Sequence, residues 1–174
     1  MNRDISPSEV SAEVPDWSRE EKRAFAWDPP RALLASIRSY HRHAGKRNPM
    51  HVLMKEFAVL RYLFWSAVKG ADVPLNCQIG GGLLLPHPNG IVIHAKAQIG
   101  PNCLIFQQVT IGVTVKGQKL PVIGGHVDIG AGAKILGDLS IGDHSVIGAN
   151  ALVMKDVPAG VSVGRPYRSL AEGQ

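Results

Sequence analysis

The chain has 174 residues, 45% of them hydrophobic and 19% charged, so it can bury one core but is too short for a conventional two-domain enzyme. The net charge of +5 is local, because residues 1–70 hold 12 Lys/Arg against 8 Asp/Glu and residues 71–174 hold 7 against 6. A basic groove is therefore not expected on the larger part, and no nucleic-acid partner is predicted.

Residues 1–27 are predicted to be a flexible N-terminal tail, because their first sixteen residues are polar and aperiodic. Residues 1–16 lack the basic start and the apolar run of a secretory signal. The apolar stretch from Phe57 to Trp65 is interrupted by Arg61 and is too short to span a bilayer. We therefore expect a cytoplasmic protein.

Residues 28–70 predict an α-helical hairpin. The first helix follows Asp28 and stops at Gly45, and the second begins after Asn48, a suitable N-cap, and stops at Gly70. The second helix carries an apolar stripe, which we expect to pack against the core. As an alternative, apolar residues beside Arg61 and Lys69 could make a peripheral membrane contact. The stripe is Leu53, Met54, Phe57, Leu60, Phe64 and Val68, and the membrane alternative uses Phe57, Leu60, Phe64 and Trp65.

From Val73 onward the aliphatic residues recur every six positions, a period that belongs neither to a helix nor to an ordinary strand. The register slips by two residues between Ile91 and Ile93, and residues 113–121 interrupt it as an extruded loop. Cys77 and Cys103 fill small inward positions of the repeat, so we expect core thiols. The three runs are Val73, Ile79, Leu85, Ile91; Ile93, Ile99, Ile105, Ile111; and Ile123, Ile129, Ile135, Ile141, Ile147, Val153.

A short strand followed by a turn, repeated every six residues, predicts a three-sided prism with 18 residues in each coil. The repeat resembles the hexapeptide of left-handed parallel β-helices, and the resemblance implies the left hand. We therefore expect an all-β left-handed parallel β-helix over residues 71–168, preceded by the hairpin and followed by a C-terminal tail at 169–174.

The repeat also sorts the histidines. His126 and His144 occupy the turn slot that Asn102 and Asn150 fill elsewhere, so they should stack one coil apart, and without a third ligand no metal site is expected. His87 differs, because its slot needs neither a turn former nor a packing residue. Prolines on both sides of His87 limit the freedom of its backbone.

The segment from Cys77 to Ile93, with Val109–Gly112 and Gly130–Gly137, resembles the serine acetyltransferase branch of the hexapeptide acyltransferases over residues 71 to about 168. The resemblance implies that His87 is the general base of an acetyl transfer and that Asp72, fifteen residues earlier, orients it. Alternatively, Asp72 simply ends the preceding helix.

The same resemblance implies acetyl-CoA as donor substrate and a homotrimer with the cofactor in the groove between two prisms. Ala131 and Ala149 match positions that admit the pantetheine arm, and Lys134, Lys155 and Arg168 would meet its phosphates. The alternative is that the alanines only suit tight turns and the lysines are solvated. The loop 113–121 would close over cofactor and acceptor.

Two departures from the family pattern concern the acceptor. Pro86 stands where the family has an acidic residue, and Lys119-Leu120-Pro121 stands where it has a basic-His-Pro segment. Free serine would lose two charged partners, each worth about 1.5–3 kcal/mol. We therefore expect a sugar hydroxyl of a bacterial exopolysaccharide or its precursor as acceptor, with serine O-acetylation as the alternative. Two further hypotheses are a zinc hydratase that uses His126 and His144, and a trimeric scaffold without catalysis.

Overall fold

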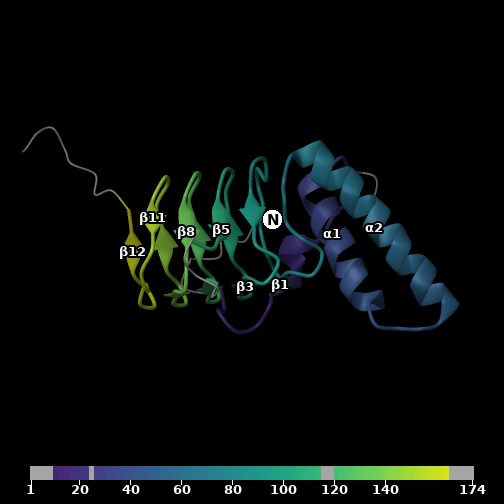
Figure 1. Ribbon diagram of the computed structural model, residues 1–174, viewed down its shortest axis with the longest axis horizontal. Coiled ribbons are helices and arrows are strands. Elements are labelled where there is room, and N and C mark those ends of the chain that lie inside the picture. Colours follow the sequence, from purple (N-terminus) through teal and green to yellow (C-terminus); the bar gives the residue numbers. More distant parts are fainter. Residues whose placement is uncertain (1–9, 24–25, 115–119, 165–174) are drawn as a thin grey trace, which may run out of the picture.

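The computed structural model describes residues 10–23, 26–114 and 120–164. A helical hairpin, α1 (Pro29–His43) and α2 (Pro49–Lys69), stands at one end of a stack of short strands (Figure 1). The Asp28 carboxylate accepts from the Arg31 amide, and the Asn48 side chain accepts from the Met50 amide, so both predicted helix starts are confirmed. Gly70 ends α2 in the left-handed conformation, at φ 55°.

The two helices bury different amounts of their apolar surface. Leu33, Leu34 and Ile37 of α1 are buried in the main core, whereas Ala58 is the buried residue of α2. The predicted core stripe of α2 is wrong, since Leu60 is 65% exposed and Leu53, Met54, Phe57, Phe64 and Val68 are exposed too. Tyr62 and Trp65, on another side of the helix, pack against the core instead. Within the described residues, neither helix has both the length and the apolarity that a membrane crossing requires.

The strands alternate with turns around the prism. In the described residues they pair in parallel into three four-stranded sheets, with orders β1-β3-β6-β9, β12-β10-β7-β4 and β11-β8-β5-β2, called sheets 1, 2 and 3 below. Their bounds are β1 Gln78–Ile79, β2 Val92–Ile93, β3 Gln98–Ile99, β4 Leu104–Ile105, β5 Thr110–Gly112, β6 Val122–Ile123, β7 Asp128–Ile129, β8 Lys134–Leu136, β9 Ser140–Ile141, β10 Val146–Ile147, β11 Leu152–Val153 and β12 Ser162–Val163.

The register confirms the predicted coil length and both of its irregularities. Ile93 pairs with Ile111, eighteen residues later, as one turn of the prism requires. Ile79 pairs with Ile99, twenty residues later, which is where the two-residue slip falls. Ile111 pairs with Ile135, twenty-four residues later, because the excursion at 113–121 adds six residues to that coil. The paired aliphatic side chains point inward and form the core.

The N-terminal segment differs from the flexible tail that composition predicted. Ser11–Glu20, the N-terminal strap, lies against the edge between sheets 1 and 2 and contains the short 3-10 helix Trp17–Glu20. The buried Asn102 side chain donates to the carbonyls of Ser11 (2.7 Å) and Val14 (2.8 Å) and accepts from the Asp16 amide (2.7 Å). The composition of the segment does not reveal this strap, because one side chain far along the chain holds it.

Both cysteines are buried thiols, as predicted. Burial raises the pKa of Cys77 to about 11, with a contribution from the Asp72 carboxylate, and burial raises the pKa of Cys103 to about 11 as well. At pH 8 only about one thiol in a thousand is then the reactive thiolate. We expect iodoacetamide to leave both cysteines unmodified in the native protein and to label both after unfolding, as measured by mass spectrometry. Fast labelling of either native cysteine would contradict this assignment.

Candidate functional site

His87 lies at the prism edge between sheets 2 and 3. It follows Leu84, which forms a bridge with Leu104, and precedes the turn at Asn89–Gly90 that leads into β2. The imidazole is exposed, while Pro88 beside it is buried and holds the bend against the prism. His87 is therefore fixed through its backbone and free at its ring, as a base that meets a substrate must be.

Hydrogen bonds align successive coils below His87 along this edge. The Asn89 carbonyl accepts from the Gln108 amide (3.0 Å), the Gln107 carbonyl accepts from Gly132 (2.9 Å), and the Ala131 carbonyl accepts from Asn150 (2.8 Å). Residues 86–90, 106–108, 130–132 and 148–150 thus form one line along the prism, named the His87 edge here. An extended molecule lying parallel to the prism axis could contact all four coils.

The small residues of the His87 edge keep it narrow. A Cβ on Gly130 would lie 2.6 Å from the Ala149 amide nitrogen, so tight stacking of the coils itself demands a glycine there. Ala131 is half-buried and Ala149 is exposed. Of the predicted cofactor-binding residues, these two alanines lie on the same edge as His87.

The side chains predicted to bind the phosphates do not all lie on the His87 edge. The Lys134 ammonium lies beside the His87 edge, where it donates to the Gln108 carbonyl (2.6 Å) and to the Thr110 hydroxyl (3.0 Å). Lys155 is exposed in the bend after β11, which is a different edge of the prism. Arg168 and most of the extruded loop lie outside the described residues.

Asp72 extends sheet 3 next to β2. It forms a parallel bridge with Val92, its amide donates to Ile91 (2.8 Å), and its carbonyl accepts from Ile93 (2.9 Å). Its carboxylate is exposed, and no hydrogen bond joins it to the His87 ring within the described part of the chain. The alternative role at the helix end is not needed, because Gly70 already caps α2.

Two α2 side chains that the sequence did not single out line a hollow beside Asp72. The hollow has a volume of about 400 Å³, and Tyr62 and Ser66 provide polar groups on its helical wall. Burial raises the pKa of Tyr62, and the negative charge of Asp72 raises it further. The four-residue spacing of Tyr62 and Ser66 puts them on one side of the helix, which was the available signal.

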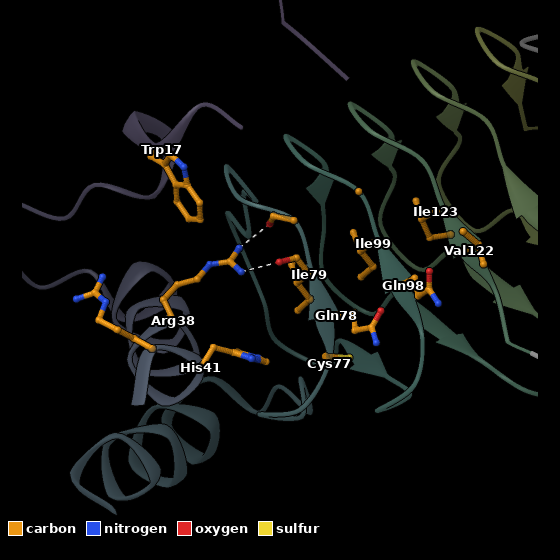
Figure 2. A pocket seen from close by; sticks show the side chains of 13 residues that line it. Trp17, Arg38, His41, Cys77, Gln78, Ile79, Gln98, Ile99, Val122 and Ile123 are labelled. Carbon is orange, nitrogen blue, oxygen red and sulfur yellow. Dashed lines mark hydrogen bonds between the residues drawn. The ribbon is translucent and has the colours of Figure 1, made fainter. Parts of the chain in front are cut away.

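A hollow of about 770 Å³, larger than the one beside Asp72, lies on sheet 1 between the prism and the hairpin (Figure 2). Trp17, His41 and the amides of Gln78 and Gln98 line it. Arg38 reaches across it but donates to the carbonyls of Ile79 and Gly80, both at 2.6 Å, and pairs with Glu20. The Arg38 guanidinium is thus occupied by hydrogen bonds within the protein, and no predicted catalytic residue lines this hollow. The volume of the hollow therefore does not make it the candidate active site.

Fold and edge together define a hexapeptide-repeat protein, a left-handed parallel β-helix behind a helical hairpin. No family model matches the chain. A serine acetyltransferase from Synechocystis sp. is 49% identical over 104 residues, which are 58% of this chain and 42% of that protein. The structure of serine acetyltransferase from Brucella abortus superposes with a TM-score of 0.67 at 31% identity, covering 80% of this chain and 55% of that one.

The serine acetyltransferase of Neisseria gonorrhoeae, solved in complex with serine, gives a TM-score of 0.64 at 33% identity and covers 82% of this chain and 57% of that one. In sequence and in fold the chain is therefore similar to the serine acetyltransferase-like branch of the hexapeptide-repeat acyltransferases. It spans about half the length of the curated relatives it matches, 42% and 43% of the two cyanobacterial ones. Its activity and substrates are therefore proposals.

Proposed function

We propose that this protein is an acetyl-CoA-dependent O-acetyltransferase whose acceptor is the hydroxyl of L-serine. The observation that carries the proposal is the His87 edge, where one exposed histidine and two small residues lie in line, in a chain whose matched relatives are serine acetyltransferases. Serine replaces the saccharide that the sequence favoured as acceptor, because the relatives that match this chain are serine acetyltransferases.

His87 supplies the chemistry as a general base. Its ring takes the proton from the acceptor hydroxyl as the oxygen attacks the thioester carbonyl, and the carbon–sulfur bond then breaks. The CoA thiolate leaves and recovers the proton from the imidazolium, so no covalent enzyme intermediate is needed. Asp72 would stabilise the imidazolium and fix its tautomer.

The donor is proposed to lie along the His87 edge. Ala131 and Ala149 would admit the pantetheine arm, and Lys134 would add positive charge near it. One prism edge forms only one wall of a cofactor-binding groove. A neighbouring prism in a homotrimer would supply the second wall. We place the enzyme in the cytoplasm, where acetyl-CoA is available. The exposed apolar side chains of α2 are proposed to contact the membrane surface peripherally.

A sugar hydroxyl is the second candidate acceptor, and Pro86 is the observation that favours it. A proline directly before His87 offers no carboxylate to the ammonium group of serine. The two candidates are separated by acceptor profiling: release of CoA is measured with L-serine and with a panel of mono- and oligosaccharides.

Pro86→Asp should improve the use of serine if serine is the acceptor. A charged hydrogen bond of about 1.5 kcal/mol corresponds to a roughly tenfold lower KM for serine. Pro86→Ala is the matched control, because it removes the ring without adding charge, and its KM should stay near that of the wild type. Turnover with sugars and none with serine in either protein would overturn the serine assignment and leave the acetyltransferase proposal standing.

A further inference from the structure

The edge between sheets 1 and 2 carries a second constellation of chemistry-bearing side chains, remote from His87. His126 and His144 lie one coil apart on this edge, with their Nδ1 atoms 2.8 Å from each other and their ring centroids 5.0 Å apart. Their backbones are fixed, because the His126 amide donates to Pro101 (2.7 Å) and the His144 amide donates to Gly125 (3.0 Å). Two imidazole nitrogens are therefore held side by side by the rigid stack.

The turn slot itself does not require histidine. His126 and His144 have φ values of 52° and 58°, and Asn102 and Asn150 occupy the same slot at 60° and 57°. Asparagine adopts this conformation at little cost. The pairing of two imidazoles on adjacent coils is thus a feature beyond what the turn needs.

The distance between the nitrogens suits one class of ligand. With metal–nitrogen bonds of about 2.0–2.1 Å, a spacing of 2.8 Å corresponds to a nitrogen–metal–nitrogen angle of roughly 85–90°. A tetrahedral zinc ion would need the nitrogens about 3.3 Å apart. Right-angled pairs of nitrogen ligands belong to the tetragonal geometries of Cu²⁺ and Ni²⁺, and Cu²⁺ binds imidazole more tightly of the two.

The histidine pair is accessible to solvent and has carboxylates near it, which favours binding of a cation. His144 is exposed, and the carboxylate of Asp143 lies at the same turn, where it accepts from the Gly125 amide (2.7 Å). Asp128 adds negative charge near His126, while Arg19 opposes it.

We propose that His126 and His144 bind a divalent transition-metal ion, Cu²⁺ in preference to Ni²⁺ or Zn²⁺, through their two Nδ1 atoms. The proton between these nitrogens moves to Nε2 of its ring, and both rings turn so that the two Nδ1 lone pairs converge on the ion; water fills its remaining positions. The site is independent of acetyl transfer, and it is not a three-histidine zinc centre.

A metal-binding experiment must distinguish this histidine pair from a second histidine pair on the hairpin. His43 and His51 of the hairpin also bring their Nδ1 atoms within 2.7 Å, so the reference protein is the full chain with His51→Gln. Cu²⁺ is titrated into this chelator-treated protein and followed by calorimetry and by the visible absorption of the ion. We expect one tight Cu²⁺ per chain, weaker Zn²⁺ binding, and a higher melting temperature in the presence of Cu²⁺.

The matched variants are His126→Asn and His144→Asn in the same background, since asparagine already fills this slot twice. Each should weaken Cu²⁺ binding on the order of 100-fold, because a chelate becomes a single ligand, and each should lose the Cu²⁺-dependent rise in melting temperature. Their melting temperatures without metal should match the reference. Unchanged Cu²⁺ affinity in either variant, or no tight site in the reference protein, overturns the proposal.

Discussion

The His87→Ala protein is expected to lose roughly 10²–10⁴-fold in kcat for acetyl transfer while it folds and binds CoA like the wild type. The reason is that an alcohol is a weak nucleophile, and no other histidine lies on the His87 edge in the described residues. Because the ring is exposed, its removal leaves the core intact. The measurement is initial-rate release of CoA, with CoA binding followed separately by calorimetry.

His41→Ala is the matched control for this experiment. His41 is also an exposed histidine, but it lies on α1 beside the hollow on sheet 1, so its loss should leave acetyl transfer unchanged. Full activity in the His87→Ala protein would reject the general-base assignment and favour a trimeric scaffold without catalysis.

Asp72→Asn tests the positioning role with a smaller effect in the same assay. Asparagine keeps the shape and the backbone pairing with Ile91 and Ile93, but it cannot stabilise an imidazolium by charge. We expect a fall in kcat with little change in KM for either substrate, and a pH–rate profile whose acidic limb moves to lower pH, because the imidazolium is no longer stabilised by a carboxylate. An unaltered profile would show that Asp72 acts on neither the charge nor the tautomer of His87.

Much of the prism could be predicted because its information is local and repeated. The two-residue slip at Ile91–Ile93 predicts the longer first coil, and the Ile79–Ile99 pairing confirms it. The common edge of His87, Ala131 and Ala149 follows from the same arithmetic, since each coil returns the chain to the same edge. The family resemblance selected these three residues, and the coil spacing accounts for their position on one edge.

The remaining features depend on contacts that periodicity does not encode. An apolar stripe on α2 indicates a face that avoids water, but not which neighbour covers it, and in this chain Tyr62 and Trp65 meet the core instead. Lys155 does not lie on the His87 edge, because it follows β11 in the bend at the next edge of the prism. The Tyr62 and Ser66 wall beside Asp72 depends on how the hairpin docks, which the repeat does not determine.

Asn102 is the clearest case, because the sequence assigned it to a turn and the structure makes it the anchor of the N-terminal strap. Its side chain makes three hydrogen bonds to strap backbone and is fully buried. Buried polar groups that lose a partner cost about 1–3 kcal/mol each, and a residue with a Cβ in the left-handed region costs about 1 kcal/mol more than asparagine. Asn102→Ala should therefore lower the free energy of unfolding by about 4 kcal/mol.

Thermal unfolding at equal protein concentration measures this loss, which corresponds to a melting temperature lower by roughly 8–16 °C in a chain of this size. Asn150→Ala is the matched control, since Asn150 has nearly the same φ, 57° against 60°, but is exposed. The control carries the backbone cost alone, so the difference between the two variants isolates the contribution of the strap. Equal losses would mean that the three hydrogen bonds add nothing, and that Ser11–Glu20 rests on the prism without stabilising it.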